Sequence, residues 1–227
     1  MDGGLADYLV VESTRPIVPL EKLDPKLAGP LTDAGATSYH GVRRVMDKLG
    51  PGRTALVIGA GGLGGFAVQY VKILTKARLI VVDVAADKRA RAEEMGADVC
   101  LDGRREDLVA EIMKLTEGRG CDAVLDFVGT NETIATSIGA LAKLSTYAVI
   151  GAGQGRLDVP LMGALSGRNA SIISFVGGTD ADVRAANGLA EQGALRNDVE
   201  LFDLEEASLA FERLAAGEIK GRGIIVP

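Results

Sequence analysis

The sequence predicts an α/β protein built around a doubly wound parallel sheet. From residue 54 onward, short apolar runs of strand length alternate with segments of helical periodicity. The runs are apolar almost throughout, so we expect helices to cover both faces of the sheet. Right-handed crossovers between parallel strands then give the doubly wound arrangement. The 30 glycines and the low aromatic content of 4% suit an aliphatic core with many tight turns.

The elements follow one another in a regular order. Strands are expected over 54–58, 78–83, 98–102, 121–128, 145–151 and 171–176. Helices are expected over 61–73, 87–95, 106–115, 132–141 and 180–192. Near the end, an apolar stripe opposite acidic residues predicts one more helix, and the final IIVP predicts a strand. The stripe consists of Leu204, Ala207, Phe211 and Leu214.

The first 50 residues follow a different pattern. The segments 5–11 and 15–20 predict short strands of an antiparallel unit, and 25–49 predicts a helix-rich bridge into the sheet. We divide the chain into residues 1–32, an α/β core over 33–176, and C-terminal helices with a final strand over 177–227.

Composition and charge exclude several classes of protein. The net charge of -6 argues against a nucleic-acid surface, which is normally basic. The two cysteines form neither a disulfide framework nor a metal pattern, which favours a reducing cytoplasm. The N-terminus lacks the pattern of a signal peptide. Residues 54–71 carry no charge, but their glycines argue against a membrane helix. We expect a cytoplasmic protein that binds neither membrane nor nucleic acid.

A glycine-rich stretch is the main functional signal. Gly59, Gly61 and Gly64 fit the pattern G-x-G-x-x-G, between a predicted strand and a predicted helix. In such a loop the first glycine allows the tight turn, the second lets a pyrophosphate approach the backbone, and the third lets helix and strand pack closely. The helix N-terminus supplies amide groups for the anion.

An acidic residue follows at the expected distance. Asp83 ends the next predicted strand, 19 residues after Gly64. A carboxylate there can accept hydrogen bonds from both hydroxyls of an adenosine ribose, and it would repel a 2′-phosphate. The pattern therefore favours NAD over NADP. FAD, which uses a similar fingerprint, is a minor alternative, and Asp83 could also be only a strand-end cap.

Other polar residues carry weaker signals. His40 is the single histidine and lies beside Tyr39, where a structural or surface role is favoured over a catalytic one. Cys100 and Cys121 fall on predicted strands and are expected to be buried, inert thiols. The run 103–107 predicts a solvated turn and helix start. The glycines of 151–155 predict a strand-end loop facing the ligand crevice, because no helix follows them.

In several stretches the sequence resembles the medium-chain, zinc-dependent alcohol dehydrogenases, in particular the bacterial NAD-dependent branch. The matching stretches include GGLADYLVV, PLTDAGATSYHGV, ALVIGAGGLGGFAVQ, VVDVAADKRARAEEMGAD, DFVG and GEIKGRGIIVP, in the family's order along the whole chain. The resemblance implies a Rossmann-type sheet. It also implies that residues 1–32 are the remnant of a GroES-like catalytic domain.

The resemblance implies a set of cofactor-binding positions. The pyrophosphate would lie on Gly59, Gly61, Gly62, Leu63 and Gly64, and the adenosine ribose on Asp83 and Lys88. The rest of the cofactor would lie along Val128, Gly129, Ile150, Gly151, Ala152, Phe175 and Val176. Arg222 would reach the pyrophosphate, for which a guanidinium is chemically suited. Thr37 would pack against the nicotinamide.

The zinc ligands of the family are incomplete here. Asp33 matches the last ligand of the catalytic zinc, and such a site needs about three protein ligands. The family's other ligands come earlier in its sequence, and this chain begins after them. The four-cysteine structural zinc lobe is missing as well. We expect Asp33 to be an orphan ligand position without zinc.

Three functions are compatible with these observations. The first is the NAD(H)-binding domain of a zinc-type alcohol dehydrogenase, inactive alone, whose small alcohol or ketone substrate requires the missing catalytic domain. The second is a stand-alone NAD(H)-binding module, or a subunit completed by another chain. The third is a zinc-free reductase with Tyr39 or His40 as proton donor. We also expect a homodimer through sheet edges, with 171–176 as the pairing strand.

Overall fold

The computed structural model describes residues 4–15, 17–158, 163 and 165–227. The chain divides into two compact units, one of residues 37–177 and the other of residues 1–36 and 178–227. Within the described part of the chain, no helix has the length and apolar character needed to span a membrane.

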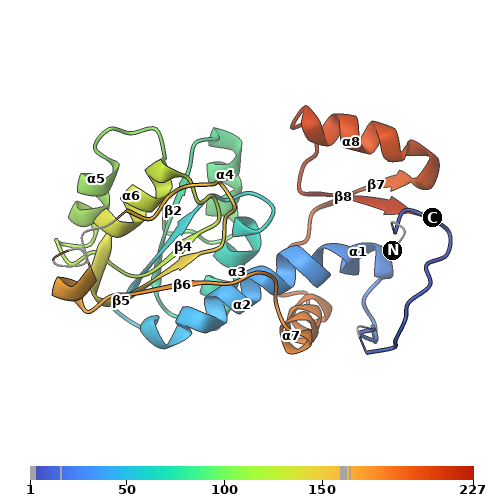
Figure 1. The fold of residues 1–227 in the computed structure, drawn as a ribbon, viewed down its shortest axis with the longest axis horizontal. Helices are drawn as coiled ribbons and strands as arrows, with labels where there is room; N and C mark the ends of the chain where they lie inside the picture. The colour runs from blue at the N-terminus through green and yellow to red at the C-terminus, as the bar shows by residue number, and fades with distance from the viewer. Residues whose placement is uncertain (1–3, 16, 159–162, 164) are drawn as a thin grey trace. The chain divides into compact units, whose positions relative to one another are not determined.

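The larger unit is built on a six-stranded parallel sheet with the strand order β3-β2-β1-β4-β5-β6 (Figure 1). Its strands are β1 (Thr54–Ile58), β2 (Arg78–Asp83), β3 (Val99–Asp102), β4 (Cys121–Asp126), β5 (Leu141–Val149) and β6 (Ser171–Ser174). This is the order of a Rossmann-type doubly wound sheet, so the predicted fold class is confirmed. The order reverses between β1 and β4, where the carboxyl ends of the strands leave a crevice for a ligand.

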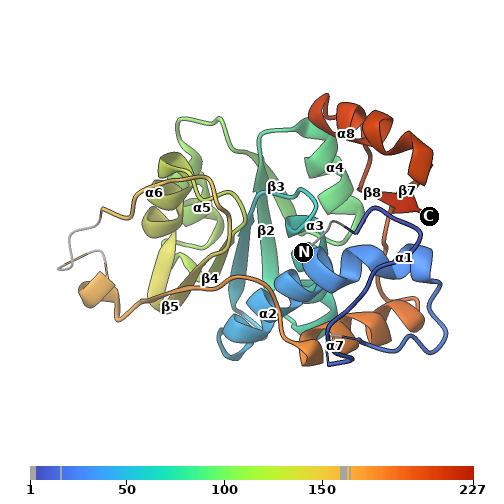
Figure 2. The ribbon, with the colours of Figure 1, turned by 45° about the vertical axis from the view of Figure 1, so that its right-hand side comes forward.

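Helices cover both faces of this sheet (Figures 1 and 2). They are α2 (Ala36–Val45), α3 (Gly64–Leu74), α4 (Ala86–Glu94), α5 (Leu108–Leu115) and α6 (Asn131–Gly139), with 3-10 turns η2 (Met46–Lys48) and η4 (Ser166–Arg168). On one face, Leu56 and Val124 belong to a buried cluster with Ile112 of α5 and Ile138 of α6. Because side chains alternate along a strand, the neighbouring Leu125 faces the other side, where it lies against Gly41 of α2.

The strands of this unit follow the expected order with small shifts at their ends. The first two have the predicted bounds, and β4 and β6 are two residues shorter than expected. The fifth strand begins at Leu141 rather than at 145, because its pairing with β4 shifts register between Cys121 and Ala123. Leu144 adopts a left-handed φ of 60° at this irregularity. The preceding helix accordingly ends at Gly139 and not at 141.

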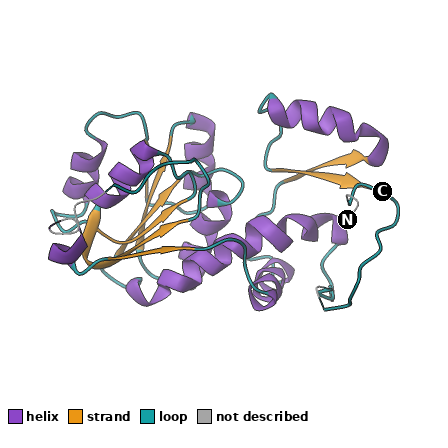
Figure 3. Ribbon diagram, in the orientation of Figure 1, coloured by secondary structure: helices purple, strands orange, loops and turns teal. Residues whose placement is uncertain are grey.

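The smaller unit combines several helices with a two-stranded parallel sheet (Figure 3). Its elements are α1 (Pro25–Pro30), the π-helical turn η1 (Leu31–Gly35), α7 (Asp180–Glu191), β7 (Val199–Asp203), the 3-10 turn η5 (Leu204–Glu206), α8 (Ala207–Ala215) and β8 (Arg222–Val226). The predicted helical bridge and closing strand are confirmed. Strand β7 is not predicted from the sequence; it pairs with β8.

Two expectations for this unit need correction. The strands expected over 5–11 and 15–20 are wrong, since the described residues there form no strand. Tyr8 and Val10 are 92% and 91% exposed, so these segments have neither the ladder partner nor the covered face that a strand needs. The apolar stripe of α8 is only partly covered: Phe211 and Leu214 are exposed, and Ala210 is the residue that the helix buries.

The glycine-rich loop is held by close backbone packing. Gly59 has a φ of 85°, and a β-carbon there would lie 2.6 Å from Val128 Cγ2. A β-carbon on Gly64 would collide with the carbonyl oxygen of Gly59. A β-carbon on Gly61, by contrast, would meet no atom within 4 Å. The chain's own packing therefore requires glycine at 59 and 64 and does not require it at 61.

This difference predicts that two matched substitutions affect stability to different extents. Gly64→Ala forces α3 away from β1 and should lower the free energy of unfolding by about 1–3 kcal/mol. Gly61→Ala should change it by less than about 0.5 kcal/mol, as an addition into open space. Denaturant unfolding of both variants and the parent chain checks this. Equal midpoints for the two variants would contradict the packing described above.

Candidate functional site

A cavity of about 930 Å³ lies in the larger unit, around the carboxyl ends of β1, β2 and β4. Its walls include the glycine-rich loop, the turns after β2 and β3, and the first turns of α5 and α6. This is the strand edge at which open α/β sheets bind their ligands, beside the reversal of strand order.

The glycine-rich loop presents the start of α3 to this cavity. The helix begins at Gly64, and no side chain caps it at Leu63. Ser38 of α2 holds the loop from behind, because its hydroxyl donates a 2.7 Å hydrogen bond to the Leu63 carbonyl. An uncapped helix N-terminus offers amide groups and a partial positive charge to an anion.

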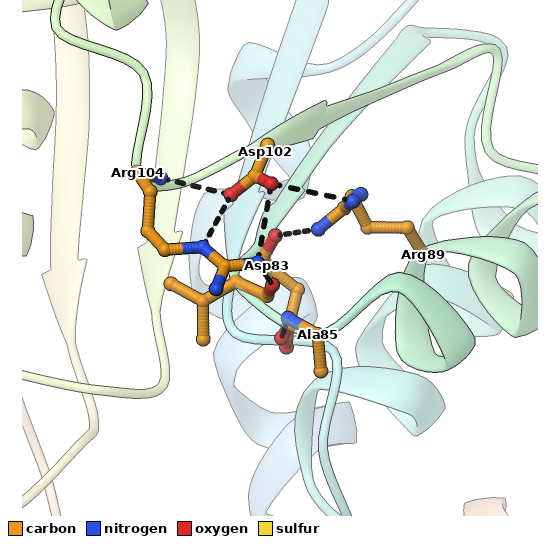
Figure 4. A network of polar contacts seen from close by, with 6 residues as sticks. Asp83, Ala85, Arg89, Asp102 and Arg104 are labelled. Atoms are coloured by element: carbon orange, nitrogen blue, oxygen red, sulfur yellow. Dashed lines mark hydrogen bonds and ion pairs between the residues drawn. The ribbon is translucent and has the colours of Figure 1, made fainter.

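Asp83 ties this loop to the turn after β2, and Figure 4 shows its contact with Ala85 in that turn. Its carboxylate accepts one hydrogen bond from the amide of Ala60 and one from the amide of Ala85, each 2.8 Å long. The residue is 8% exposed and lines the cavity. A carboxylate has about four acceptor positions, so the two amide bonds fix its orientation and leave acceptor capacity for a ligand.

Asp126 shapes the opposite wall in the same manner. It is fully buried, and its carboxylate accepts hydrogen bonds from the amides of Val128 and Gly129 and from the hydroxyl of Tyr147. Burial, followed by the charge of Asp126, raises the pKa of Tyr147, which keeps the phenol protonated as a donor. The turn that these bonds hold brings Gly129 against the backbone of Gly151.

The cavity is lined by some of the residues that were predicted to bind the cofactor. The predicted residues that line it are Gly59, Gly61, Gly62, Leu63, Gly64, Asp83, Lys88 and Val128. Gly129, Ile150, Gly151 and Ala152 follow the ends of β4 and β5 and do not line it. Gly153 donates its amide to the Val128 carbonyl, so the 151–155 loop is packed on this turn. Arg222 begins β8 in the other unit.

Several lining residues are absent from the predicted set. They are Arg104, Arg105, Glu106, Leu108, Val109, Thr130, Glu132, Thr133 and Thr136, together with strand-end and turn residues. The run 103–107 forms the solvated turn that the sequence predicts. Its two arginines also belong to the cavity wall. Its role in the cavity wall could have been predicted from its position directly after a strand, at the same edge of the sheet as Asp83.

The weak catalytic candidates all lie on α2. Thr37 is buried, while Tyr39 and His40 are half-buried. The Tyr39 ring meets the buried Tyr70 edge-on with 5.3 Å between centroids. The His40 ring lies 4.7 Å from that of Phe175, and its Nδ1 is 3.2 Å from the Arg43 guanidinium. These contacts are structural ones, and a catalytic role for the three residues stays a prediction.

Potential metal ligands are dispersed in the described part of the chain. Asp33 is exposed on η1. No group of three or more His, Cys, Asp or Glu side chains among the described residues is arranged to hold a metal ion. Among the described residues, the donors therefore do not form the three-ligand catalytic zinc site of the family.

Both cysteines are protonated at neutral pH. Cys121 on β4 is buried, and burial raises its pKa to about 12. Cys100 on β3 is half-buried rather than buried as expected, and desolvation together with the charge of Glu93 raises its pKa to about 11. Neither thiol has the lowered pKa of a nucleophile.

Comparison with known proteins identifies relatives along the whole chain. The NAD-dependent alcohol dehydrogenase of Saccharolobus solfataricus is 35% identical over 233 residues, which cover 100% of this chain. The crystal structure of an alcohol dehydrogenase from the hyperthermophilic archaeon Aeropyrum pernix superposes with a TM-score of 0.91 at 33% identity, covering 100% of this chain and 66% of that one. The D-arabinose dehydrogenase from Sulfolobus solfataricus gives a TM-score of 0.79 at 28% identity, covering 86% of this chain and 60% of that one.

The chain spans 65% of the length of the S. solfataricus alcohol dehydrogenase that it matches. The model of the family described as zinc-binding dehydrogenase matches residues 62–192, which is more than half of the chain. That match includes α3, the strands from β2 to β6 and the turn of Asp83. This chain therefore belongs to the zinc-binding, medium-chain alcohol dehydrogenase family.

Proposed function

We propose that the cavity binds NAD(H), with the adenosine ribose on Asp83. The observation that carries this proposal is the Asp83 carboxylate, buried at the cavity wall and oriented by the amides of Ala60 and Ala85. An oriented carboxylate with acceptor capacity suits the two ribose hydroxyls, and its charge disfavours a 2′-phosphate. Lys88 lies in the same wall, where the resemblance expects a lysine near the ribose.

The pyrophosphate would lie on the glycine-rich loop. The uncapped start of α3 supports this, as does the open space around Gly61. Because folding does not require glycine at 61, its lack of a side chain is explained by the close approach of a ligand to the backbone.

We further propose that the chain forms the nucleotide-binding part of a zinc-type alcohol dehydrogenase. The names of its relatives support hydride transfer between an alcohol or ketone and NAD. Nicotinamide supplies the hydride chemistry, and the protein fixes the cofactor's position and surroundings. We propose that the 227-residue chain does not turn over alcohols by itself, since Asp33 is the single zinc-ligand position that the resemblance assigns to it.

The cofactor assignment predicts a clear preference in direct titrations. NADH should bind saturably, and NADPH at least about tenfold more weakly, because like charges brought together cost several kcal/mol. Asp83→Asn removes the charge and should reduce this preference about tenfold by weakening NADH and relieving the repulsion of NADPH. Fluorescence titration with each cofactor measures the ratio of the NADH and NADPH affinities. A parallel assay with zinc, NAD and an alcohol measures turnover.

Two further variants sharpen that experiment. Gly61→Ala should weaken NADH at least about fivefold while leaving the melting temperature unchanged, because the methyl group occupies space meant for the pyrophosphate. Asp98→Asn is the matched control: Asp98 pairs with Lys72 before β3 and lines a separate pocket, so both affinities should stay the same. Absence of NADH binding, or equal affinity for the two cofactors, would refute the assignment.

We also propose that the chain forms a homodimer through β6. This strand is an edge of the six-stranded sheet, with half-buried Ile172 and Ile173, and Val176 just beyond it is fully exposed. An unpaired edge of this kind favours pairing with a second strand.

The dimer has a direct test. Light scattering should give twice the chain mass of 23.6 kDa at micromolar concentration. Ser171→Lys should shift the mass towards the monomer, because lysine on an edge strand opposes pairing and would face its own copy. A monomeric parent chain would rule the dimer out.

A further inference from the structure

The end of β3 carries a second carboxylate in register with Asp83. Asp102 pairs with Asp83 across the β2–β3 ladder, so both residues reach the same edge of the sheet. Asp102 accepts a hydrogen bond from the amide of Arg104, and this bond, followed by that from the Arg104 side chain, lowers the pKa of its carboxyl. The group is therefore ionised at neutral pH.

Asp102 holds two guanidinium groups (Figure 4). Arg104 meets it with two nitrogens: Nε lies 3.2 Å from Oδ1, and Nη2 lies 3.3 Å from Oδ2. Arg89 approaches from α4, with 3.4 Å between its guanidinium and Oδ2. A planar guanidinium bound at two points to a carboxylate has a fixed orientation.

The same arginines are anchored a second time, on the backbone beside Asp83. Arg89 donates a 2.8 Å hydrogen bond to the carbonyl of Asp83, and Arg104 donates one of 2.6 Å to the carbonyl of Val84. The two side chains differ in freedom: that of Arg89 is 19% exposed and that of Arg104 is 69% exposed. Arg104 is thus the one that could reorient if Asp102 no longer held it.

Arg104 lines the cavity together with Asp83 and Val84. An arginine close to the ribose-binding position is the group that accommodates the 2′-phosphate in NADP-dependent proteins. This chain has such an arginine, yet two of its nitrogens are engaged by Asp102 and the Val84 carbonyl. The Arg104 guanidinium, which could favour NADP, is therefore present but bound to Asp102 within the protein.

We propose that Asp102 is a specificity-determining residue for NAD over NADP, which acts by holding the Arg104 guanidinium away from the 2′-position of the ribose. Asp102 is a positioning residue, since it acts through Arg104. Discrimination then has two parts: Asp83 repels a 2′-phosphate, and Asp102 withholds the cation that would offset this repulsion. The inference rests on the proposed NAD(H) site.

The test compares cofactor ratios in a small set of variants. At about pH 8, where a phosphate monoester is fully ionised, Asp102→Asn should raise NADPH affinity about three- to fivefold, the upper part of the range of one exposed ion pair. NADH affinity should stay within about twofold of the parent. The added substitution Arg104→Gln should abolish the gain in NADPH affinity. A purely structural role of Asp102 would lower both affinities together.

Two controls separate the proposal from simpler explanations. Asp98→Asn also removes a paired carboxylate adjoining β3, and it should leave both affinities unchanged. Arg104→Gln alone should change the ratio less than Asp102→Asn does, because in the parent chain Asp102 already holds this arginine. This exposed substitution keeps the proposal testable even if Asp102→Asn lowers the yield of folded protein.

Three outcomes would overturn the proposal. They are an unchanged ratio in Asp102→Asn, a gain in NADPH affinity that persists in the double variant, and a drop of more than about twofold in NADPH affinity in Arg104→Gln alone. Failure of the proposed function is distinct from all three, because the parent chain would then bind no NADH or show no preference.

Discussion

The two hydrogen bonds of the Asp83 carboxylate are the constraint on which the site depends. They join the amide of Ala60, in the glycine-rich loop, to the amide of Ala85, at the start of α4. Loops at strand ends have few backbone partners of their own, and a buried acceptor between two of them fixes both. The position of the helix N-terminus relative to the carboxylate is thereby set before any ligand arrives.

The same device recurs along this edge of the sheet. Asp83, Asp102 and Asp126 each end a strand, and each accepts the amide of the residue two positions later. Such local turns are a common use of aspartate after a strand. Three carboxylates on one edge would repel one another, and two are compensated within the protein, Asp102 by arginines and Asp126 by Tyr147 and amides. The described hydrogen bonds of the Asp83 carboxylate come from amides alone, so among these three aspartates it is the one that lines the cavity without a cationic or hydroxyl partner.

The sequence predicted the inner strands of the sheet well because β1, β2 and β4 are buried almost throughout. In an α/β chain, continuous apolar runs such as TALVI and RLIVVD indicate buried parallel strands. Accordingly, β1 and β2 have the predicted bounds. Where burial is partial, the pattern weakens. Strand β7 has the short mixed sequence VELFD and buries only Phe202, so it was missed. Segments 5–11 and 15–20 have the composition of strands, but their chain neighbours supply no ladder partner, which composition cannot reveal.

The residues of the candidate site were likewise predicted only in part. Asp83 was predictable because its spacing from the glycines reflects one strand–helix–strand unit. Arg104 was not, since an Arg-Arg pair in a polar turn is typical of a solvated surface. Its role depends on the β2–β3 register, which brings Asp102 beside Asp83 and the turn after β3 into the cavity wall. Register between strands is a tertiary property, set by packing of the two faces and not by the turn's own residues.

The glycine fingerprint itself consists of two kinds of position. Gly59 and Gly64 are required by the fold, because a left-handed φ and contact between α3 and β1 exclude a side chain there. A protein with this strand–helix packing would keep both whether or not it bound a nucleotide. Gly61 meets no neighbouring atom, and in the middle of a loop a glycine costs conformational entropy without structural return. The second glycine, Gly61, and Asp83 are therefore the positions that indicate ligand binding. The other two glycines indicate only the packing of α3 against β1.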